Sequence, residues 1–417
     1  MGYIVGLKYA LIICCGSVAV WWVIVPAISW LFPDLVVSTG SSSVTASQAS
    51  AEQIFQYAKS IGIGGIAMAG IIGIFKSRKI IMGAVGLAAQ EMKGKGKSDT
   101  AVPRTQKDLS MKIIAVGSLL TLAAILLFFY FGVMEGNLLF TLTGVLLVAV
   151  IAFLFTTVAA NAIAIVGSNP VSGMTLMTLI LASVIMVAVG LKGPAGMVAA
   201  LIMGGVVCTA LSTAGSFITD LKIGYWLGST PKKQETFKFL GTLVSAATVA
   251  GVIMILNDTY GFTSGQLAAP QANAMAAVIE PLMSGAGAPW LLYGIGAALA
   301  ILLTLFNVSA LAFALGMFIP LELNLPLLVG GLINWYVTTR SSKEQVNKER
   351  GEKGTLIASG FIAGGALMGV VSAALRFGGI SFDYSAWWAN PASEWLSLLM
   401  YVLLIIYMIK ASMRIKK

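Results

Sequence analysis

The sequence predicts an all-α fold, a polytopic transmembrane helix bundle with about 10–12 spans. Two observations predict it. Of the 417 residues, 58% are apolar and only 10% are charged, whereas a soluble domain has about a quarter of its residues charged because its surface faces water. The charged residues also gather in short stretches between apolar runs, and these runs are long enough to cross about 30 Å of hydrocarbon. We expect one transmembrane domain over residues 1–417.

Each apolar run in turn predicts a span. The first run ends in tryptophans typical of a membrane-interface belt, with a cleaved signal peptide as the alternative. The run over 306–336 is too long for one span and contains Pro320 and Pro326, so we predict discontinuous helices near 307–331. The predicted spans are 9–30, 61–75, 111–130, 138–166, 174–189, 195–216, 239–256, a helix from Trp290, the broken run, 356–375 and 395–409.

The basic residues indicate the orientation. When successive spans alternate in direction, 23 of the 26 Lys and Arg residues fall on one side, which the positive-inside rule identifies as the cytoplasm. Both termini are then cytoplasmic, as are a mobile basic loop over 84–110 and a second basic loop over 340–353. The formal charge of +10 therefore needs no nucleic-acid partner. The three cysteines lie in apolar runs and the chain has no histidine, so we expect no metal site and no cofactor.

The segment Gly167–Thr175 interrupts two apolar runs. Pro170 has no N–H and disfavours a helical Asn169, so we predict discontinuous helices near 167–175. Ser168, Asn169, Ser172 and Thr175 can cap the helix that follows. Its free N–H groups and positive dipole end are a site for a carboxylate if the break lies at bilayer depth, and a well-capped turn if it lies at the surface.

Two further segments combine polar residues with helix breaks. The segment Asp220–Gln234 joins an acid and bases to an aromatic, glycine-bounded loop, with an interfacial anchor as the alternative. In the broken run, Glu322 is a functional candidate because a carboxylate within an apolar run is costly without a partner or water. The alternative is a carboxylate that reaches the interface. An outer stretch after the span 239–256 carries Gln271, Asn273 and Glu280.

Two glycine-rich segments share a short sequence pattern. Gly64, Ile66, Ala67 and Gly73 recur as Gly360, Ile362, Ala363 and Gly369. The predicted topology sends the two segments in opposite directions, which an inverted repeat would explain. Small-residue patterns that arise from helix packing alone are the alternative.

Four motifs in order resemble one family. They are AIVGSNPVSGMT (164–175), DLKIGYWLGSTPKKQ (220–234), PQANAMA (270–276) and FIPLELNLPLLVGGLI (318–333). Together they resemble the oligopeptide transporter family, prokaryotic branch, which is related to the yellow-stripe-like metal-chelate carriers. The resemblance covers nearly the whole chain but about the C-terminal two-thirds of a family member, so a separate N-terminal fragment or a homo-oligomer is an expected partner.

The resemblance implies a secondary active transporter that imports short oligopeptides by alternating access, coupled to a cation such as the proton. Peptide-like metal chelates are the alternative substrate. The implied substrate-binding residues are Asn161, Ser168, Asn169, Pro170, Ser172, Gly173, Thr175, Gln271, Asn273, Asn307, Ser309 and Asn324. Without histidine, a proton carrier must be a carboxylate, so Glu322, Asp220 and Glu280 are the candidates. Gly224, Tyr225, Gly228, Pro231, Pro320 and Pro326 are candidates for structural or gating roles.

Two other classes remain as alternatives. One is a channel or an inactive partner subunit, which would not show saturable, gradient-dependent uptake. The other is a membrane enzyme, but the sequence lacks HExxH, a nucleophile elbow, a P-loop and paired acidic motifs. We therefore expect a transporter in the inner membrane of a prokaryote rather than an enzyme.

Overall fold

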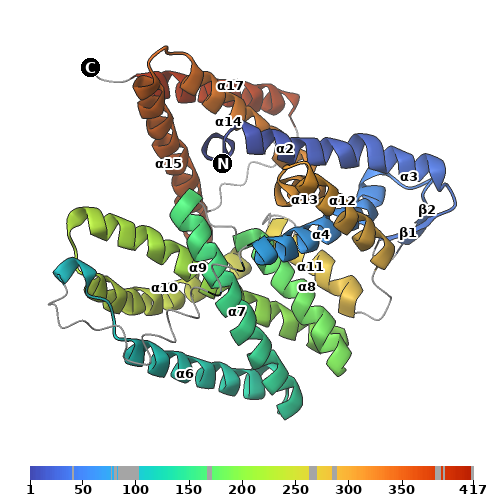
Figure 1. Cartoon of the computed structure of the whole chain (residues 1–417). Helices are drawn as coiled ribbons and strands as arrows, with labels where there is room; N and C mark the ends of the chain where they lie inside the picture. The colour runs from blue at the N-terminus through green and yellow to red at the C-terminus, as the bar shows by residue number, and fades with distance from the viewer. Residues whose placement is uncertain are drawn as a thin grey trace. The chain divides into compact units, whose positions relative to one another are not determined.

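The computed structural model describes residues 1–39, 42–76, 78, 82, 103–166, 171–262, 270–283, 289–380, 387 and 390–414. These residues, drawn in Figure 1, form two compact units. Unit 1 comprises residues 1–59, 246–268 and 312–417, and unit 2 comprises residues 60–245 and 269–311. Three of the described helices contribute residues to both units, α4 (Ala51–Lys76), α10 (Pro231–Tyr260) and α13 (Ala310–Phe318).

Unit 2 is a helical bundle that contains α8 (Val171–Val189). The other helices are a 3₁₀ turn (Arg104–Gln106), α6 (Met111–Phe128) with a π-helical end (Phe129–Val133), α7 (Leu138–Val166), α9 (Gly193–Leu227), α11 (Pro270–Met283) and α12 (Trp290–Leu305). Phe155, Leu179, Met186, Met203 and Ile279 are buried together in one apolar core. The core therefore joins α7, α8, α9 and α11, with α4 packed on α8 where Gly70 faces the Met177 side chain.

Unit 1 is built around the pair α2 and α14. It contains α1 (Gly2–Val5), α2 (Leu7–Val18), a π-helical turn (Ala19–Ile24), α3 (Val25–Leu31), α13 (Ala310–Phe318, from Ala312 onward), α14 (Leu321–Thr339), α15 (Glu344–Phe377) and α17 (Pro391–Met413). A short antiparallel hairpin of β1 (Val36–Thr39) and β2 (Ser42–Thr45) follows α3. Its β-branched residues suit a strand. It is a small addition to a fold that is otherwise helical.

Glycines allow the helices of unit 1 to approach closely. A Cβ on Gly16 would overlap the carbonyl of Phe313, and a Cβ on Gly316 would overlap the carbonyl of Ile13. This reciprocal contact brings the backbones of α2 and α13 together, as small residues do in membrane helix pairs. Tyr3 is buried, and its hydroxyl donates to the Arg350 carbonyl (3.4 Å), so α1 is fixed against α15.

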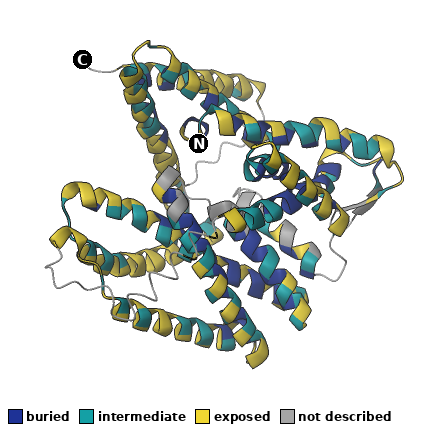
Figure 2. Ribbon diagram, viewed as in Figure 1, coloured by how far each residue is buried: buried dark blue, intermediate teal, exposed yellow. Residues whose placement is uncertain are grey.

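The fold class predicted from composition is confirmed. Within the described residues, seven helices are long and apolar enough to cross a membrane, and α12 and part of α8 are shorter apolar helices. In Figure 2 the surfaces of α10, α15 and α17 are mostly exposed, whereas α8 and α9 carry buried residues. Helices with such exposed apolar surfaces suit a lipid environment. The discontinuity predicted in the long apolar run is also present, because that run divides at 306–309 and at 319–320. The one predicted near 167–175 stays a prediction, because 167–170 lie outside the described residues.

Two predicted connections are corrected by the structure. Residues 344–353, expected as part of a basic loop, are the first turns of α15. Charges of alternating sign four residues apart support a helix there, as at Glu344, Lys348 and Glu352. The expected outer stretch after residue 256 contains α11, whose Ile279 and Met283 are buried in the core of unit 2. Apolar residues at 275, 279, 282 and 283 give α11 the helical spacing that buries one face.

The mobile loop predicted over 84–110 stays a prediction, because 84–102 lie outside the described residues. Residues 103–110 are described, and three hydrogen bonds join them to the turn between α9 and α10. The inverted repeat also stays a prediction. Gly64 packs on the backbone of Tyr293, whereas a Cβ on Gly360 or Gly369 would meet nothing within 4 Å among the described residues.

Candidate functional site

Two of the predicted motifs lie side by side in unit 2. Helix α8, which begins in the first motif, packs against α11, which begins in the third (Figure 1). The Met283 sulfur, at the end of α11, lies 3.3 Å from the position of a Cβ on Gly196, just after α8 has turned into α9. The C-terminal ends of α8 and α11 therefore lie together, and the two helices run parallel with their N-terminal ends at the same end of the core.

This arrangement places several predicted substrate residues on two adjacent helix starts. Ser172, Gly173 and Thr175 lie in the first turns of α8, and Gln271 and Asn273 lie in the first turn of α11. In general, the start of an α-helix carries backbone N–H groups without a helical partner and the positive end of the helix dipole, which together favour a carboxylate or another anion. The fold therefore brings together two motifs that are separated by about a hundred residues in the sequence.

The remaining first-motif residues divide between described and undescribed positions. Asn161 lies in α7, which packs against α8 and α9. Thr175 is buried, with 2% of its surface exposed. Ser168, Asn169 and Pro170 lie outside the described residues.

Two buried hydroxyl groups on α8 were missed by the sequence analysis. Thr178 and Ser183 are both buried. The Thr178 hydroxyl donates to the Met174 carbonyl (2.9 Å), while the Ser183 hydroxyl has no hydrogen-bond partner among the described residues. The signal that could have found them is the recurrence of Ser and Thr at 175, 178 and 183 in a run that is otherwise apolar.

The second motif forms the turn between α9 and α10. Gly228 ends α9 in the left-handed region (φ 68°), and the Ser229 N–H donates to the Gly224 carbonyl (2.8 Å), so the turn is a glycine C-cap. Pro231 is the first residue of α10, where its missing N–H is not needed. Gly224 is buried because the Gln234 amide packs where a side chain would stand. Tyr225 is exposed.

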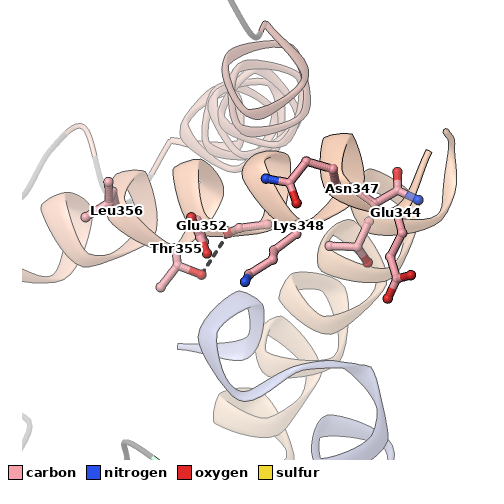
Figure 3. A pocket seen from close by; sticks show the side chains of 9 residues that line it. Glu344, Asn347, Lys348, Glu352, Thr355 and Leu356 are labelled. Atoms are coloured by element: carbon pink, nitrogen blue, oxygen red, sulfur yellow. Dashed lines mark hydrogen bonds between the residues drawn. The ribbon is translucent and has the colours of Figure 1, made fainter.

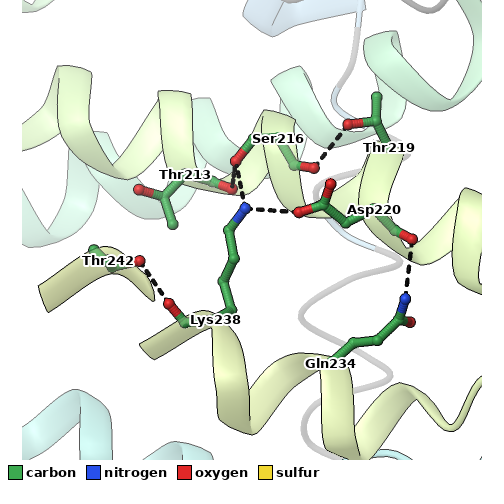
Figure 4. A network of polar contacts seen from close by, with 7 residues as sticks. All are labelled: Thr213, Ser216, Thr219, Asp220, Gln234, Lys238 and Thr242. Carbon is green, nitrogen blue, oxygen red and sulfur yellow. Dashed lines mark hydrogen bonds and ion pairs between the residues drawn. The ribbon is translucent and has the colours of Figure 1, made fainter. Parts of the chain in front are cut away.

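Asp220 is held by an ion pair in this hairpin (Figure 4). The Lys238 ammonium lies 2.7 Å from Asp220 Oδ2 and 3.0 Å from Ser216 Oγ. The Gln234 amide donates to the Asp220 carbonyl (3.2 Å). These contacts surround a cavity of about 370 Å³ that Phe217 and Phe237 also line. A paired carboxylate at a helix–helix contact is suited to holding α9 and α10 in register.

Asn324 forms hydrogen bonds across the break in the long apolar run of unit 1. Only 2% of its surface is exposed. Its amide nitrogen lies 3.0 Å from Ser17 Oγ on α2, 3.1 Å from the Ile319 carbonyl and 3.2 Å from the Gly316 carbonyl. The Gly316 carbonyl has no N–H partner four residues further along the chain, because that residue is Pro320. Asn324 therefore supplies the donor that the helix break removes, and it also joins the break to α2.

The other predicted residues of the broken run are more accessible. Asn307 adopts a left-handed backbone (φ 57°) that links α12 to α13, a conformation that Asn tolerates. Pro320 is the N-cap of α14, Glu322 is exposed in its first turn, and Pro326 lies exposed within it. Ser309 lies in the same link as Asn307 and is half-buried. Glu280 of α11 is exposed.

A polar pocket lies beside the start of α15 in unit 1 (Figure 3). Glu344, Asn347, Lys348, Glu352 and Thr355 line it, and its volume is about 1210 Å³. The Asn347 side chain bonds the backbone of Ser341 at both its oxygen (3.1 Å) and its nitrogen (2.8 Å). The pocket is wide and its charges are mixed, so its geometry selects no particular ligand.

Long apolar helices, with one apolar run broken at Pro320, define a multi-pass α-helical membrane protein. The chain belongs to the oligopeptide transporter family, since the model of that family, described as OPT oligopeptide transporter protein, matches residues 1–376. A Haemophilus influenzae protein named "Putative oligopeptide transporter" is 25% identical over 469 aligned positions, which cover all of this chain and 72% of that protein. The family predicted from the four motifs is confirmed, while the branch and the relation to the yellow-stripe-like carriers stay predictions.

Proposed function

We propose that the chain is a secondary active transporter that imports short oligopeptides across the inner membrane of a prokaryote, with both termini in the cytoplasm. The observation that carries the proposal is the parallel pair α8 and α11, whose N-terminal ends lie at one end of the unit 2 core. Two adjacent helix starts suit the carboxylate that ends every free peptide. Family membership supports the same substrate class.

Transport proceeds by alternating access and is coupled to protons. Glu322 is the first candidate for the proton carrier because it is exposed and directly follows the Pro320 break. Asp220 is a weaker candidate because Lys238 holds its carboxylate. Glu280 lies on α11, two turns beyond Asn273, and is the second candidate. The helix breaks at 306–309 and 319–320 are points where the chain can bend between states.

Uptake of labelled di- to tetrapeptides by proteoliposomes under an imposed pH gradient tests the transport proposal. We expect saturable uptake that the gradient drives. Amidation of the peptide C-terminus removes the carboxylate, so it should raise KM about 10- to 100-fold, the equivalent of losing one charged hydrogen bond. Equal KM values for free and amidated peptides would remove the helix starts as the carboxylate site. Uptake that does not saturate would indicate a channel, and inhibition by metal chelates at lower concentrations than peptides would indicate the alternative substrate.

Variants test the assigned residues. Thr175→Val removes a buried hydroxyl near the start of α8 and should raise KM, whereas Thr121→Val on α6 is the matched control because its exposed hydroxyl bonds only its own helix (2.9 Å). Glu322→Gln should abolish the dependence of uptake on the pH gradient, with Glu344→Gln as the control at an exposed helix start. An unchanged pH dependence in Glu322→Gln would transfer the role to Glu280, which Glu280→Gln tests in the same assay.

A further inference from the structure

The turn between α9 and α10 carries a basic and aromatic surface that the transport proposal does not use. We call Lys107, Lys222, Tyr225, Trp226, Lys232 and Lys233 the hairpin patch. All six lie on or beside the turn, since the Lys232 N–H donates to the Lys107 carbonyl (2.8 Å) and the Arg104 guanidinium donates to the Gly228 carbonyl (2.9 Å). The patch is therefore a defined part of unit 2 rather than a set of independent side chains.

The charge of the patch is not neutralised by its own acids. Residues 103–112 and 220–238 contain seven basic and three acidic residues. Of the three acids, Asp220 is paired with Lys238, and Glu235 accepts the Leu109 N–H (2.7 Å). Lys107, Lys222, Lys232 and Lys233 are all exposed. An anionic partner would therefore meet several cations that the hairpin leaves available.

The aromatic residues of the patch are as exposed as its lysines. Tyr225 is 70% exposed, Trp226 71% and the adjacent Leu227 78%. The Lys222 ammonium lies 5.5 Å from the centres of both the Tyr225 and the Trp226 rings. One cation therefore lies close to two aromatic rings at the C-terminal end of α9. Tyr and Trp at the end of a membrane helix are typical of the membrane–water interface.

The length of α9 supports this location. Its 35 residues extend about 52 Å at 1.5 Å per residue, which exceeds about 30 Å of hydrocarbon. If the apolar part of α9 spans the bilayer, its C-terminal end reaches the headgroup layer. There a phosphate can contact the lysines while acyl chains cover Trp226 and Leu227.

We propose that the hairpin patch binds the headgroup of an anionic phospholipid and that the lipid's chains cover the exposed aromatic and apolar side chains beside it. A free phosphate would satisfy only the lysines and would leave Trp226 and Leu227 in water. A phospholipid satisfies both groups at once, so the observations favour the lipid. The bound lipid also bridges α9, α10 and the 103–110 segment, because each contributes a cation.

Native mass spectrometry of the full chain in detergent tests the proposal. The protein is delipidated and then titrated with dioleoyl phosphatidylglycerol or dioleoyl phosphatidylcholine, and the ratio of the two association constants is measured. In the wild type we expect preferential binding of phosphatidylglycerol. Since each basic residue near an anionic surface contributes about 1 kcal/mol, each charge removed should lower this preference about fivefold. K232Q/K233Q should therefore lose most of it, K222Q part of it, and K232R/K233R little.

The matched control is K343Q/K348Q, which removes the same charge beside α15 in unit 1. If this control keeps the preference for phosphatidylglycerol, the proposal that the hairpin patch binds the lipid is supported. Equal losses of the preference in K232Q/K233Q and K343Q/K348Q would overturn the proposal, because they would show an effect of total charge. Trp226→Ala should lower the affinity for both lipids, and no change there would overturn the covering role of the acyl chains. If inorganic phosphate or glycerol phosphate displaces phosphatidylglycerol at equal concentration, the site is a phosphate site and the lipid proposal is wrong.

Discussion

The replacement of Asn324 by Ala tests how the broken helix of unit 1 is held together. The Asn324 amide has two hydrogens for three acceptors at 3.0–3.2 Å, so at most two strong hydrogen bonds are lost at once. A hydrogen bond between membrane helices contributes about 0.6–2 kcal/mol, and a buried acceptor left without a donor adds to the loss. We expect Asn324→Ala to lower the free energy of unfolding by about 2–3 kcal/mol.

Steric trapping in bicelles or equilibrium unfolding in mixed micelles measures this loss. Asn257→Ala is the control, because it makes the same change on the exposed surface of α10 and should stay within about 0.5 kcal/mol of the wild type. Ser17→Ala removes one of the three acceptors and should cost about 1 kcal/mol. A result for Asn324→Ala that matches Asn257→Ala would refute the reasoning, because it would mean that the carbonyls of Gly316 and Ile319 need no donor from Asn324.

Three more predictions follow from the packing of the helices, the α9–α10 turn and the ion pair beside it. Gly16→Ala should destabilise the protein because its Cβ would overlap the Phe313 carbonyl, whereas Gly360→Ala, which meets nothing within 4 Å among the described residues, should stabilise α15 by about 0.5–1 kcal/mol; thermal unfolding in one detergent compares the two. Gly228→Ala should cost about 1 kcal/mol because Ala disfavours φ 68°, and Gly228→Asn should cost less; hydrogen exchange at the α9–α10 turn measures both. Lys238→Gln should cost no more than about 1 kcal/mol, since both side chains of its ion pair with Asp220 are partly exposed, and a loss that persists in 1 M salt would show that packing rather than charge is involved.

The sequence predicted those features that depend on local chemistry. Pro320 was expected to interrupt the long apolar run, because proline breaks a helix. The structure has that break, whereas the predicted connection between the spans 195–216 and 239–256 is shorter than expected, since α9 continues to Leu227 and α10 starts at Pro231. Composition was sufficient for the fold class, because too few charged residues are present to cover a soluble protein of this size.

The sequence did not predict the features that depend on contacts between residues far apart in the chain. Helix α11 has 14 residues, which is too short to register as a span, and it is identified as part of the core only by its packing on α8. Asn324 was expected to bind substrate, yet its donor group lies against Ser17, which is 307 residues away in the chain. The helix over 344–353 was read as a loop because its charges suggested water on all sides, although the same charges support a helix. Whether the candidate residues at 167–175 and at 318–331 act on one substrate stays a prediction, because they belong to different units.

The Asn324 hydrogen bonds and the glycine contact between α2 and α13 depend on each other. In lipid, helices gain little from burying apolar surface against each other, so close approach through small residues and interhelical hydrogen bonds must hold them. Gly16 and Gly316 let the two backbones meet, and that approach brings Ser17 within 3.0 Å of the Asn324 amide. A larger residue at Gly16 should therefore break the hydrogen bond as well as the contact. The losses of unfolding free energy caused by Gly16→Ala and Asn324→Ala should then be less than additive. If the two interactions were independent, the double variant would lose the sum of the two.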